Sequence, residues 1–232
     1  DEAGNVIEPK ITHIDWDLDM AEKGGYPDFM LKEIHEQPRV VRDTLVGRMT
    51  PAGELDIDEL GLSLEELNDI DRVYVIACGT SYHAGLIAKN LIEGWARIPT
   101  EVEAASEFRY RNPIITPTTL VVAVSQSGET ADTLAAIRDA RIKGAKVFGI
   151  TNVVGSPVAR ESDGVIYTKA NKEIAVASTK SFIGQVVSLT LLALLLAQVK
   201  YRLTTKQTRM MFRELSDTAE QIQCCLLYTS PS

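Results

Sequence analysis

The stretch VVAVSQSGETADTL, residues 121–134, decides the fold that the sequence predicts. Its first four residues are apolar and typical of a short buried strand, and a helical pattern begins after the glycine. Between strand and helix lie three hydroxyl side chains, those of Ser125, Ser127 and Thr130. Hydroxyls in this place either cap the first turn of the helix or face an anion, because both roles use the unpaired N–H groups of a helix start.

The same order of strand, turn and helix recurs along the chain. RVYVIA at 72–77 precedes the turn CGTSYHAG and a second helix, and KVFGITN at 146–152 follows the helix that Gly144 ends. Short strands are expected near 101–104 and 165–168. Alternating strands and helices predict an α/β fold, a three-layer sandwich with a mostly parallel sheet flanked by helices and right-handed crossovers.

The two ends of the chain differ from this regular part. Residues 1–66 are rich in Asp, Glu, Gly and Pro and are expected to form a mainly irregular and helical connector, in which Pro38 should kink or interrupt a helix. Residues 67–223 should form the α/β domain. The last residues, CCLLYTSPS at 224–232, do not continue the helical period before them and are expected to be an atypical tail.

Composition excludes several classes of partner. The 232 residues include 24 Lys and Arg against 32 Asp and Glu, so the net charge of −8 gives no general attraction to nucleic acid. The longest apolar run, at 186–197, is shorter than the roughly 20 residues that span a bilayer, so a buried helix and no membrane partner are expected. The 3 cysteines match neither a disulfide framework nor a zinc spacing, which indicates reducing cytoplasm.

The predicted fold indicates where a ligand would bind. In an open parallel sheet, ligands lie beyond the carboxyl ends of the strands, where the turns into the helices converge. Gly79 and Gly128 let the backbone approach a ligand, and the helix starts add positive potential for a phosphate. No metal cluster, Walker motif or GxGxxG motif is present, so no cofactor is expected. The polar residues of these turns are Thr80, Ser81, Ser125, Gln126, Ser127, Thr130 and Ser178.

Four further side chains near these turns are given no catalytic role. His83 is expected to be packed or solvated, and Lys180 to be exposed, although a cation is unfavourable in the first turn of a helix. Glu129 and Glu173 are the carboxylates within the turns, and neither has a visible partner base. The sequence therefore predicts a binding site without catalytic residues.

The turns CGTSYHAG, SQSGETADTL and EIAVASTKSF, in this order and at these separations, resemble the sugar-isomerase (SIS) domain, a phosphosugar-binding α/β fold. The segment THIDWDLDMAEKGGYPDFMLKEIHEQP, residues 12–38, narrows the likeness, because it resembles the junction ahead of the first SIS domain in the glucosamine-6-phosphate synthase family. The resemblance covers residues 12 to about 222. Members of that family join a glutaminase domain to two SIS domains and convert fructose 6-phosphate and ammonia into glucosamine 6-phosphate.

The resemblance implies a role for each turn. Ser125, Gln126, Ser127 and Thr130 would bind the phosphate, and the rest of the sugar pocket would consist of Thr80, Ser81, Val176 through its backbone, and Ser178. The implied partners are the phosphosugar substrate and a second copy of the chain in a homodimer. The glutaminase domain and the second SIS domain, which carries the isomerising lysine, glutamate and histidine, are expected outside these 232 residues, so the chain alone should bind sugar without turnover.

Two other functions stay open at this stage. A sugar-phosphate sensor of the same fold would carry a DNA-binding helix-turn-helix ahead of the domain, but residues 1–66 contain no basic recognition helix. A free-standing isomerase would need its own base, for which Glu129 or Glu173 would have to serve. The helix expected over Ser178–Gln198 is apolar on most sides, so it must be buried either in the core or in an interface.

Overall fold

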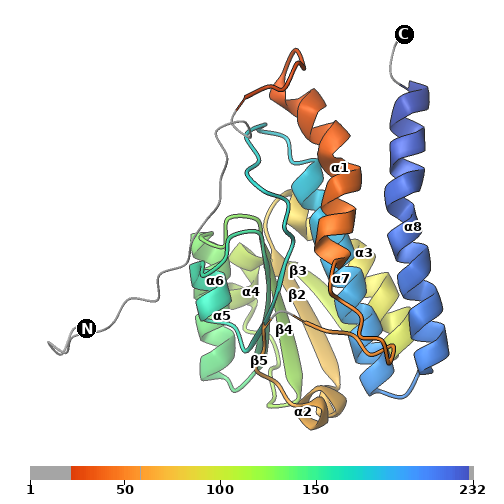
Figure 1. Ribbon diagram of the computed structural model, residues 1–232. Helices are drawn as coiled ribbons and strands as arrows, with labels where there is room; N and C mark the ends of the chain where they lie inside the picture. The colour runs from red at the N-terminus through yellow and green to blue at the C-terminus, as the bar shows by residue number, and fades with distance from the viewer. Residues whose placement is uncertain (1–21, 58, 230–232) are drawn as a thin grey trace, which may run out of the picture.

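The computed structural model describes residues 22–57 and 59–229. These residues form a six-stranded sheet of order β1-β6-β5-β4-β2-β3 with helices packed against it (Figure 1). Strands β2 to β6 are parallel, and the short β1 runs antiparallel to β6. The parallel sheet confirms the prediction, whereas β1 was not expected. The strands are β1 (Glu59–Leu60), β2 (Arg72–Ala77), β3 (Thr100–Ala104), β4 (Thr119–Ser125), β5 (Lys146–Thr151) and β6 (Gly164–Tyr167).

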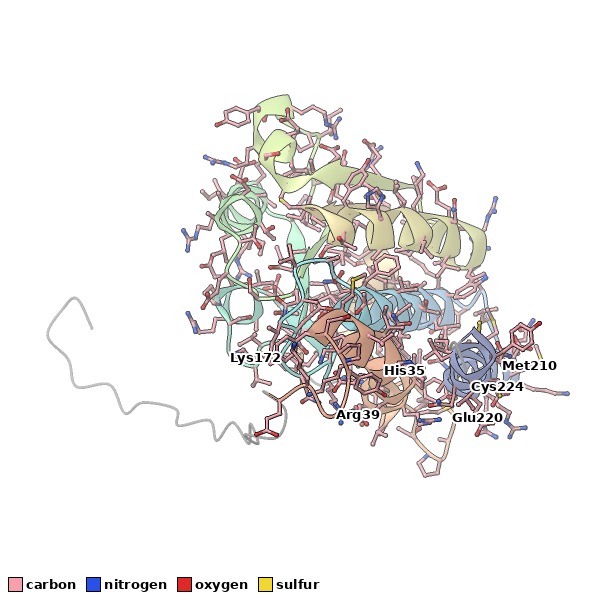
Figure 2. All side chains as sticks on the ribbon, turned by 90° about the horizontal axis from the view of Figure 1, so that it is seen from above. His35, Arg39, Lys172, Met210, Glu220 and Cys224 are labelled. Carbon is pink, nitrogen blue, oxygen red and sulfur yellow. The ribbon has the colours of Figure 1, made fainter. Side chains whose placement is uncertain are left out.

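Helices cover both faces of this sheet (Figures 1 and 2). Alternate residues of each strand point to opposite faces. Val73 and Val75 of β2 therefore pack with α3 and α7, while Tyr74 and Ile76 pack with α4 and α5. The three-layer sandwich is confirmed. The helices are α1 (Phe29–Leu45), α2 (Leu64–Asp69), α3 (Thr80–Leu91), its π-helical continuation η2 (Ile92–Ala96), α4 (Ala105–Arg111), α5 (Ala131–Ile142), α6 (Pro157–Arg160), α7 (Lys180–Val199) and α8 (Thr205–Thr229).

Helix α7 lies between the sheet layer and the pair α1 and α8 (Figure 2). Of its 20 residues, 15 are buried. By length and hydropathy it is the one helix of the described part that could cross a membrane, but most of its surface is covered by the rest of the chain. Helix α7 is therefore a core helix, as the sequence predicted.

The connector contributes directly to this core. Helix α1 runs without a break through Pro38, so the expected interruption was wrong; Pro38 is buried, and tertiary packing retains the helix despite the lost hydrogen bond. Near the end of α1, Thr44 Oγ1 donates to the Thr168 carbonyl at 2.5 Å. Arg48 donates to the Tyr167 carbonyl at 3.3 Å. The connector helix is thus fastened to the segment that follows β6.

Helix α8 runs further than the sequence pattern indicated. Its residues Leu215, Ala219 and Ile222 pack on the core, which confirms the helical period. The helix then continues to Thr229 through Cys224 and Cys225, both exposed, so the first part of the expected tail is helical. A helix can continue past its apolar stripe because its backbone hydrogen bonds are local. Residues 230–232 of the expected tail lie outside the described residues.

A local charge cluster joins α2 to the sheet. Ser63 and Glu66 form a capping box at the start of α2, and Lys146 at the start of β5 donates to the Glu66 carboxylate. The hydrogen bond from Lys146, followed by those from Ser63, lowers the pKa of Glu66 from 4.5 to about 2. Its contribution to stability is therefore present above pH 4.5 and is lost as the pH falls toward 2.

We expect Glu66→Gln to lower the thermal midpoint at neutral pH and to lose less stability than the wild type on acidification, because glutamine cannot be protonated in this range. The two midpoints should therefore converge between about pH 5 and pH 2. Thermal unfolding followed by circular dichroism across this range measures it. Glu65→Gln removes a carboxylate from the same turn and should follow the wild-type profile. A constant gap between Glu66→Gln and the wild type would contradict the assignment.

Candidate functional site

The turns after β2 and β4 are neighbours at the carboxyl ends of these two strands. Strands β2 and β4 pair in parallel, with Ala77 opposite Val124, so the turns that follow them leave the sheet side by side. The segment after β6 reaches the same end of the molecule before α7 begins (Figure 1). The structure thus brings the three predicted segments to the carboxyl ends of the strands, where α/β folds bind ligands.

The turn from Ser125 to Thr130 is braced by its own hydroxyls. Ser125 is buried, and its Oγ lies 2.9 Å from Thr130 Oγ1 and accepts from the Gly128 N–H at 3.1 Å. Ser127 Oγ accepts from the Glu129 N–H at 3.2 Å. Gln126, Ser127 and Thr130 are half-buried, so their polar groups remain accessible.

The hydroxyls of these turns do not cap the helices that follow. Thr130, which precedes α5, makes no side-chain capping bond. Gly79, which precedes α3, has no side chain that could cap that helix. Helices α1, α2 and α6, in contrast, are capped by the side chains of Asp28, Ser63 and Ser156. Apart from the Tyr82 N–H, which donates to the Gly79 carbonyl at 3.1 Å, the first-turn N–H groups of α3 and α5 therefore remain available to a ligand, which favours the anion interpretation over capping.

The turn after β2 requires glycine for its backbone. Gly79 has φ 58° and ψ −133°, a conformation that side chains rarely permit, and an added Cβ would meet no atom within 4 Å. The glycine therefore serves the turn and leaves open space beside it. Thr80 is exposed and Ser81 is half-buried, at the start of α3.

The segment before α7 differs from the other two. Glu173 Oε1 accepts from the backbone N–H groups of Thr179 and Ser181, at 3.0 and 3.2 Å. The start of α7 is thus occupied by a carboxylate of the chain itself, and Glu173 has a structural task. Within this segment Ser178 is half-buried and Val176 is fully exposed, so both residues are accessible to a ligand.

Lys180 overturns one expectation from the sequence. It is buried, and its Nζ lies 2.6 Å from Glu36 Oε2 of α1. This carboxylate compensates the charge that the helix start disfavours. The sequence reasoning missed Glu36, although a lysine in an unfavourable place was a signal that a partner existed.

His83 is exposed, and its ring centroid lies 5.8 Å from that of Tyr82. The other carboxylate of the turns, Glu129, is also exposed.

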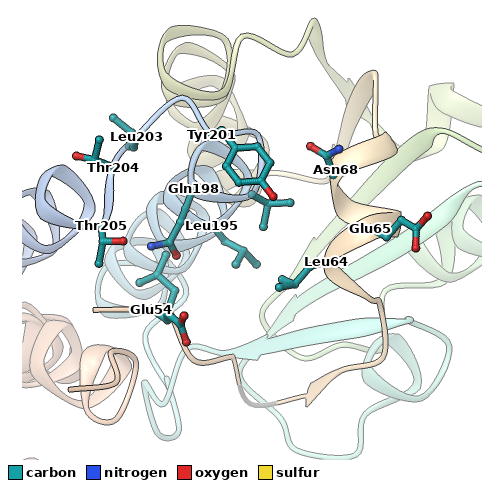
Figure 3. Close-up of a pocket in the computed structure, with 12 residues that line it drawn as sticks. Glu54, Leu64, Glu65, Asn68, Leu195, Gln198, Tyr201, Leu203, Thr204 and Thr205 are labelled. Atoms are coloured by element: carbon teal, nitrogen blue, oxygen red, sulfur yellow. The ribbon is translucent and has the colours of Figure 1, made fainter. Parts of the chain in front are cut away.

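A cavity of about 820 Å³ lies at the opposite end of the molecule, near α2 and the end of α7 (Figure 3). None of the three turns contributes to it. Among residues 22–57 and 59–229, no group of three His, Cys, Asp or Glu side chains could hold a metal ion. The cavity lining consists of Glu54, Leu55, Leu64, Glu65, Asn68, Leu195, Gln198, Val199, Tyr201, Leu203, Thr204 and Thr205.

Comparison with protein families agrees with this geometry. The family model of the SIS domain matches residues 66–195, which include the sheet from β2 to β6 and the start of α7. The chain belongs to the SIS domain family. The match contains all eight predicted site residues, while α1 and its carboxylates precede it.

Two relatives of this SIS chain from different bacteria carry the same enzyme name. The glutamine–fructose-6-phosphate aminotransferase (isomerizing) of Clostridium tetani is 50% identical over 226 residues, which are 97% of this chain and 37% of that protein. The enzyme of the same name from Streptomyces coelicolor is 56% identical over 197 residues, 85% of this chain and 32% of that protein. The chain thus spans about a third of the length of the relatives that it matches.

Solved structures share the fold. The C-terminal domain of glucosamine-fructose-6-phosphate aminotransferase from Francisella tularensis superposes with a TM-score of 0.80 at 41% identity, over 86% of this chain and 55% of that one. Glucosamine-6-phosphate deaminase from Thermotoga maritima has a TM-score of 0.60 at 24% identity, over 82% of this chain and 54% of that one. The second likeness concerns the fold alone.

Gly128 provides a test of how the turn from Ser125 to Thr130 is built. Its φ is +67°, and an added Cβ would overlap Ser156 and lie 2.8 Å from Thr151 Oγ1. We expect Gly128→Ala to destabilise the protein by about 2–4 kcal/mol, through overpacking combined with backbone strain. Chemical denaturation measures the change.

Gly155 is the matched control for this substitution, because its φ of +68° is nearly the same but an added Cβ meets no atom within 4 Å. Gly155→Ala should cost only the strain of the left-handed backbone, about 1 kcal/mol. Equal losses for the two variants would show that the contact with Ser156 does not shape the turn.

Proposed function

We propose that this SIS chain is the part of a glutamine–fructose-6-phosphate aminotransferase that binds fructose 6-phosphate and glucosamine 6-phosphate. The observation that carries the proposal is the turn from Ser125 to Thr130, whose hydroxyls are fixed by one another while the helix start behind them is uncapped. Such a start offers N–H donors and positive potential to a phosphate. The names of the relatives support the choice of sugar.

Each segment has a separate task in this proposal. Gln126, Ser127 and Thr130 donate to the phosphate together with the first N–H groups of α5, and Ser125 holds the turn from within. The remaining pocket residues, Thr80, Ser81, the Val176 backbone and Ser178, face the hydroxyl groups of the sugar. Neutral donors bind a dianion without the strong attraction of a lysine cluster, so that the product can leave.

The chain by itself should bind without catalysing. Amination of fructose 6-phosphate needs ring opening, attack by an amine and proton transfer between adjacent carbons, which requires a positioned base. Glu173 is engaged with the start of α7, and Glu129 is exposed to solvent. Neither placement supports the hypothesis of a free-standing isomerase. The catalytic groups are proposed to lie outside these 232 residues. A sugar-phosphate sensor would use the same pocket and stays the alternative.

Two attributes rest on the family likeness alone. A homodimer in the cytoplasm is proposed from the resemblance to other SIS proteins. The apolar helix gave a reason to expect an exposed pairing surface, but α7 is covered by the sheet, α1 and α8, and so gives no such reason.

Calorimetric titration with fructose 6-phosphate tests the binding proposal. The double variant Ser127→Ala, Thr130→Ala removes two hydrogen bonds to a charged group, each worth about 1.5–3 kcal/mol, so affinity should fall at least about tenfold. Thr116→Ala with Thr118→Ala is the control, since this double variant removes two hydroxyls just before the amino end of β4, at the opposite end of the strand from the candidate site. Unchanged affinity in the first double variant would refute the phosphate site.

Turnover with ammonium in place of glutamine tests the second part. We expect the 232-residue chain to form no glucosamine 6-phosphate and to leave fructose 6-phosphate unisomerised, because a missing general acid or base costs about 10²–10⁴-fold each. Mass spectrometry of the sugar phosphates provides the readout. Turnover that Glu129→Gln or Glu173→Gln abolishes would favour a free-standing isomerase instead.

A further inference from the structure

The segment between β6 and α7 has little apolar packing to hold it. It forms no helix or strand from 168 to 179, and its apolar side chains Ile174 and Val176 are 38% and 106% exposed. The position of this backbone therefore depends on polar side chains that bond to it. Because the proposed sugar pocket takes Val176 and Ser178 from this segment, those polar side chains determine the shape of the pocket.

Besides Thr44, which donates to the Thr168 carbonyl, three further side chains bond to the backbone of the segment. Asn152 Oδ1 accepts from the Ala170 N–H at 2.7 Å, and its Nδ2 donates to the Asn171 carbonyl at 2.6 Å. Glu173 fixes the end of the segment on α7, as described above. The middle is held by Glu33, which belongs to α1 and precedes the part of the chain that the SIS family model matches.

The burial of the Glu33 carboxylate is unfavourable in free energy. Its side chain is buried, and Oε1 accepts from the consecutive N–H groups of Ile174 and Ala175 at 2.6 and 3.2 Å. Its Oε2 is buried too and finds no hydrogen-bond partner among the described residues. A half-satisfied buried carboxylate is unfavourable for stability on its own. What it achieves is a fixed position for the two amides directly before Val176.

A second contact from the same helix reinforces the first. Glu36, three residues after Glu33, lies on the same side of α1 and forms the ion pair with Lys180, whose side chain is 3% exposed. Helix α1 therefore holds the segment at 174–175 and again at its junction with α7. In Figure 2, which is seen from above, Lys172 of the segment and His35 of α1 are labelled.

We propose that Glu33 is a positioning residue of the sugar pocket: from the connector helix, it sets the backbone at Ile174 and Ala175 so that Val176 and Ser178 can reach the sugar. The inference rests on the proposed function, because these two residues form a pocket only if a phosphosugar binds. It also makes α1 a part of the binding site, so that a displacement of α1 changes sugar binding without touching the phosphate turn.

The test compares two ligands on the same variants. Calorimetry with fructose 6-phosphate reports the whole pocket, and calorimetry with inorganic phosphate reports the turn from Ser125 to Thr130. Glu33→Ala removes two charge-assisted bonds from the segment and should weaken fructose 6-phosphate binding about tenfold while changing phosphate binding less than about twofold. Glu33→Gln keeps an oxygen that can accept both N–H groups and should bind the sugar nearly as the wild type does.

Two further variants keep the test decisive. Glu33→Asp retains the buried charge but shortens its reach by one methylene, so it should show the same selective loss as Glu33→Ala even if the alanine variant does not fold. Asp43→Ala removes a carboxylate whose side chain is 41% exposed from the same helix and should leave both affinities unchanged.

Wild-type sugar affinity in folded Glu33→Ala or Glu33→Asp overturns the inference. An equal loss for both ligands also overturns it, because a general loss of structure would then explain the result. Failure of the proposed function looks different: the double variant Ser127→Ala, Thr130→Ala would then keep its affinity for both ligands, whatever the Glu33 variants do.

Discussion

The burial of α7 is the constraint on which the rest of the structure depends. This helix is apolar around most of its circumference, so water must be excluded from nearly all sides of it. The sheet and α3 cover one side, and α1 and α8 cover the other. Two segments at the ends of the chain are thereby drawn into the core.

This arrangement couples packing to the candidate site. The start of α7 lies at the edge of the sheet where the polar turns converge, so the helix that covers α7 also lies beside the site. Glu33 and Glu36 extend from α1 to this edge, where they meet backbone N–H groups and Lys180. The region carries a concentration of buried polar groups with unpaired atoms, among them Thr179, Ser181 and Gln185. Sites of function often retain such costs because their geometry matters more than local stability.

The capping pattern separates the hydroxyls that cap helices from those of the candidate site. Ser63 and Ser156 accept hydrogen bonds from backbone N–H groups at helix starts with their hydroxyl oxygens, whereas Thr130 bonds to Ser125 and leaves the start of α5 uncapped. Both classes of residue look alike in the sequence, since a serine or threonine precedes a helix in each case. The difference depends on side-chain rotamers and on neighbouring turns, which a linear pattern does not specify.

The sequence by itself determined the strands β2 to β6, the turns between them and the layered sheet. These features follow from short-range signals, namely apolar runs, glycines at turns and helical periodicity, whose meaning does not depend on remote residues. The resemblance of the three turns to the SIS domain, now confirmed, added the family.

The tertiary structure alone decided how the remote parts meet. Lys180 is buried because Glu36 lies beside it, 144 residues away in the chain, and α1 continues through Pro38 because α7 and α8 pack against it. Strand β1 forms because Glu59 and Leu60 lie opposite β6, the outermost strand of the parallel part of the sheet on that side. Each outcome is set by a partner that no local pattern names, since the free energy of burial and of ion pairing depends on what approaches in space.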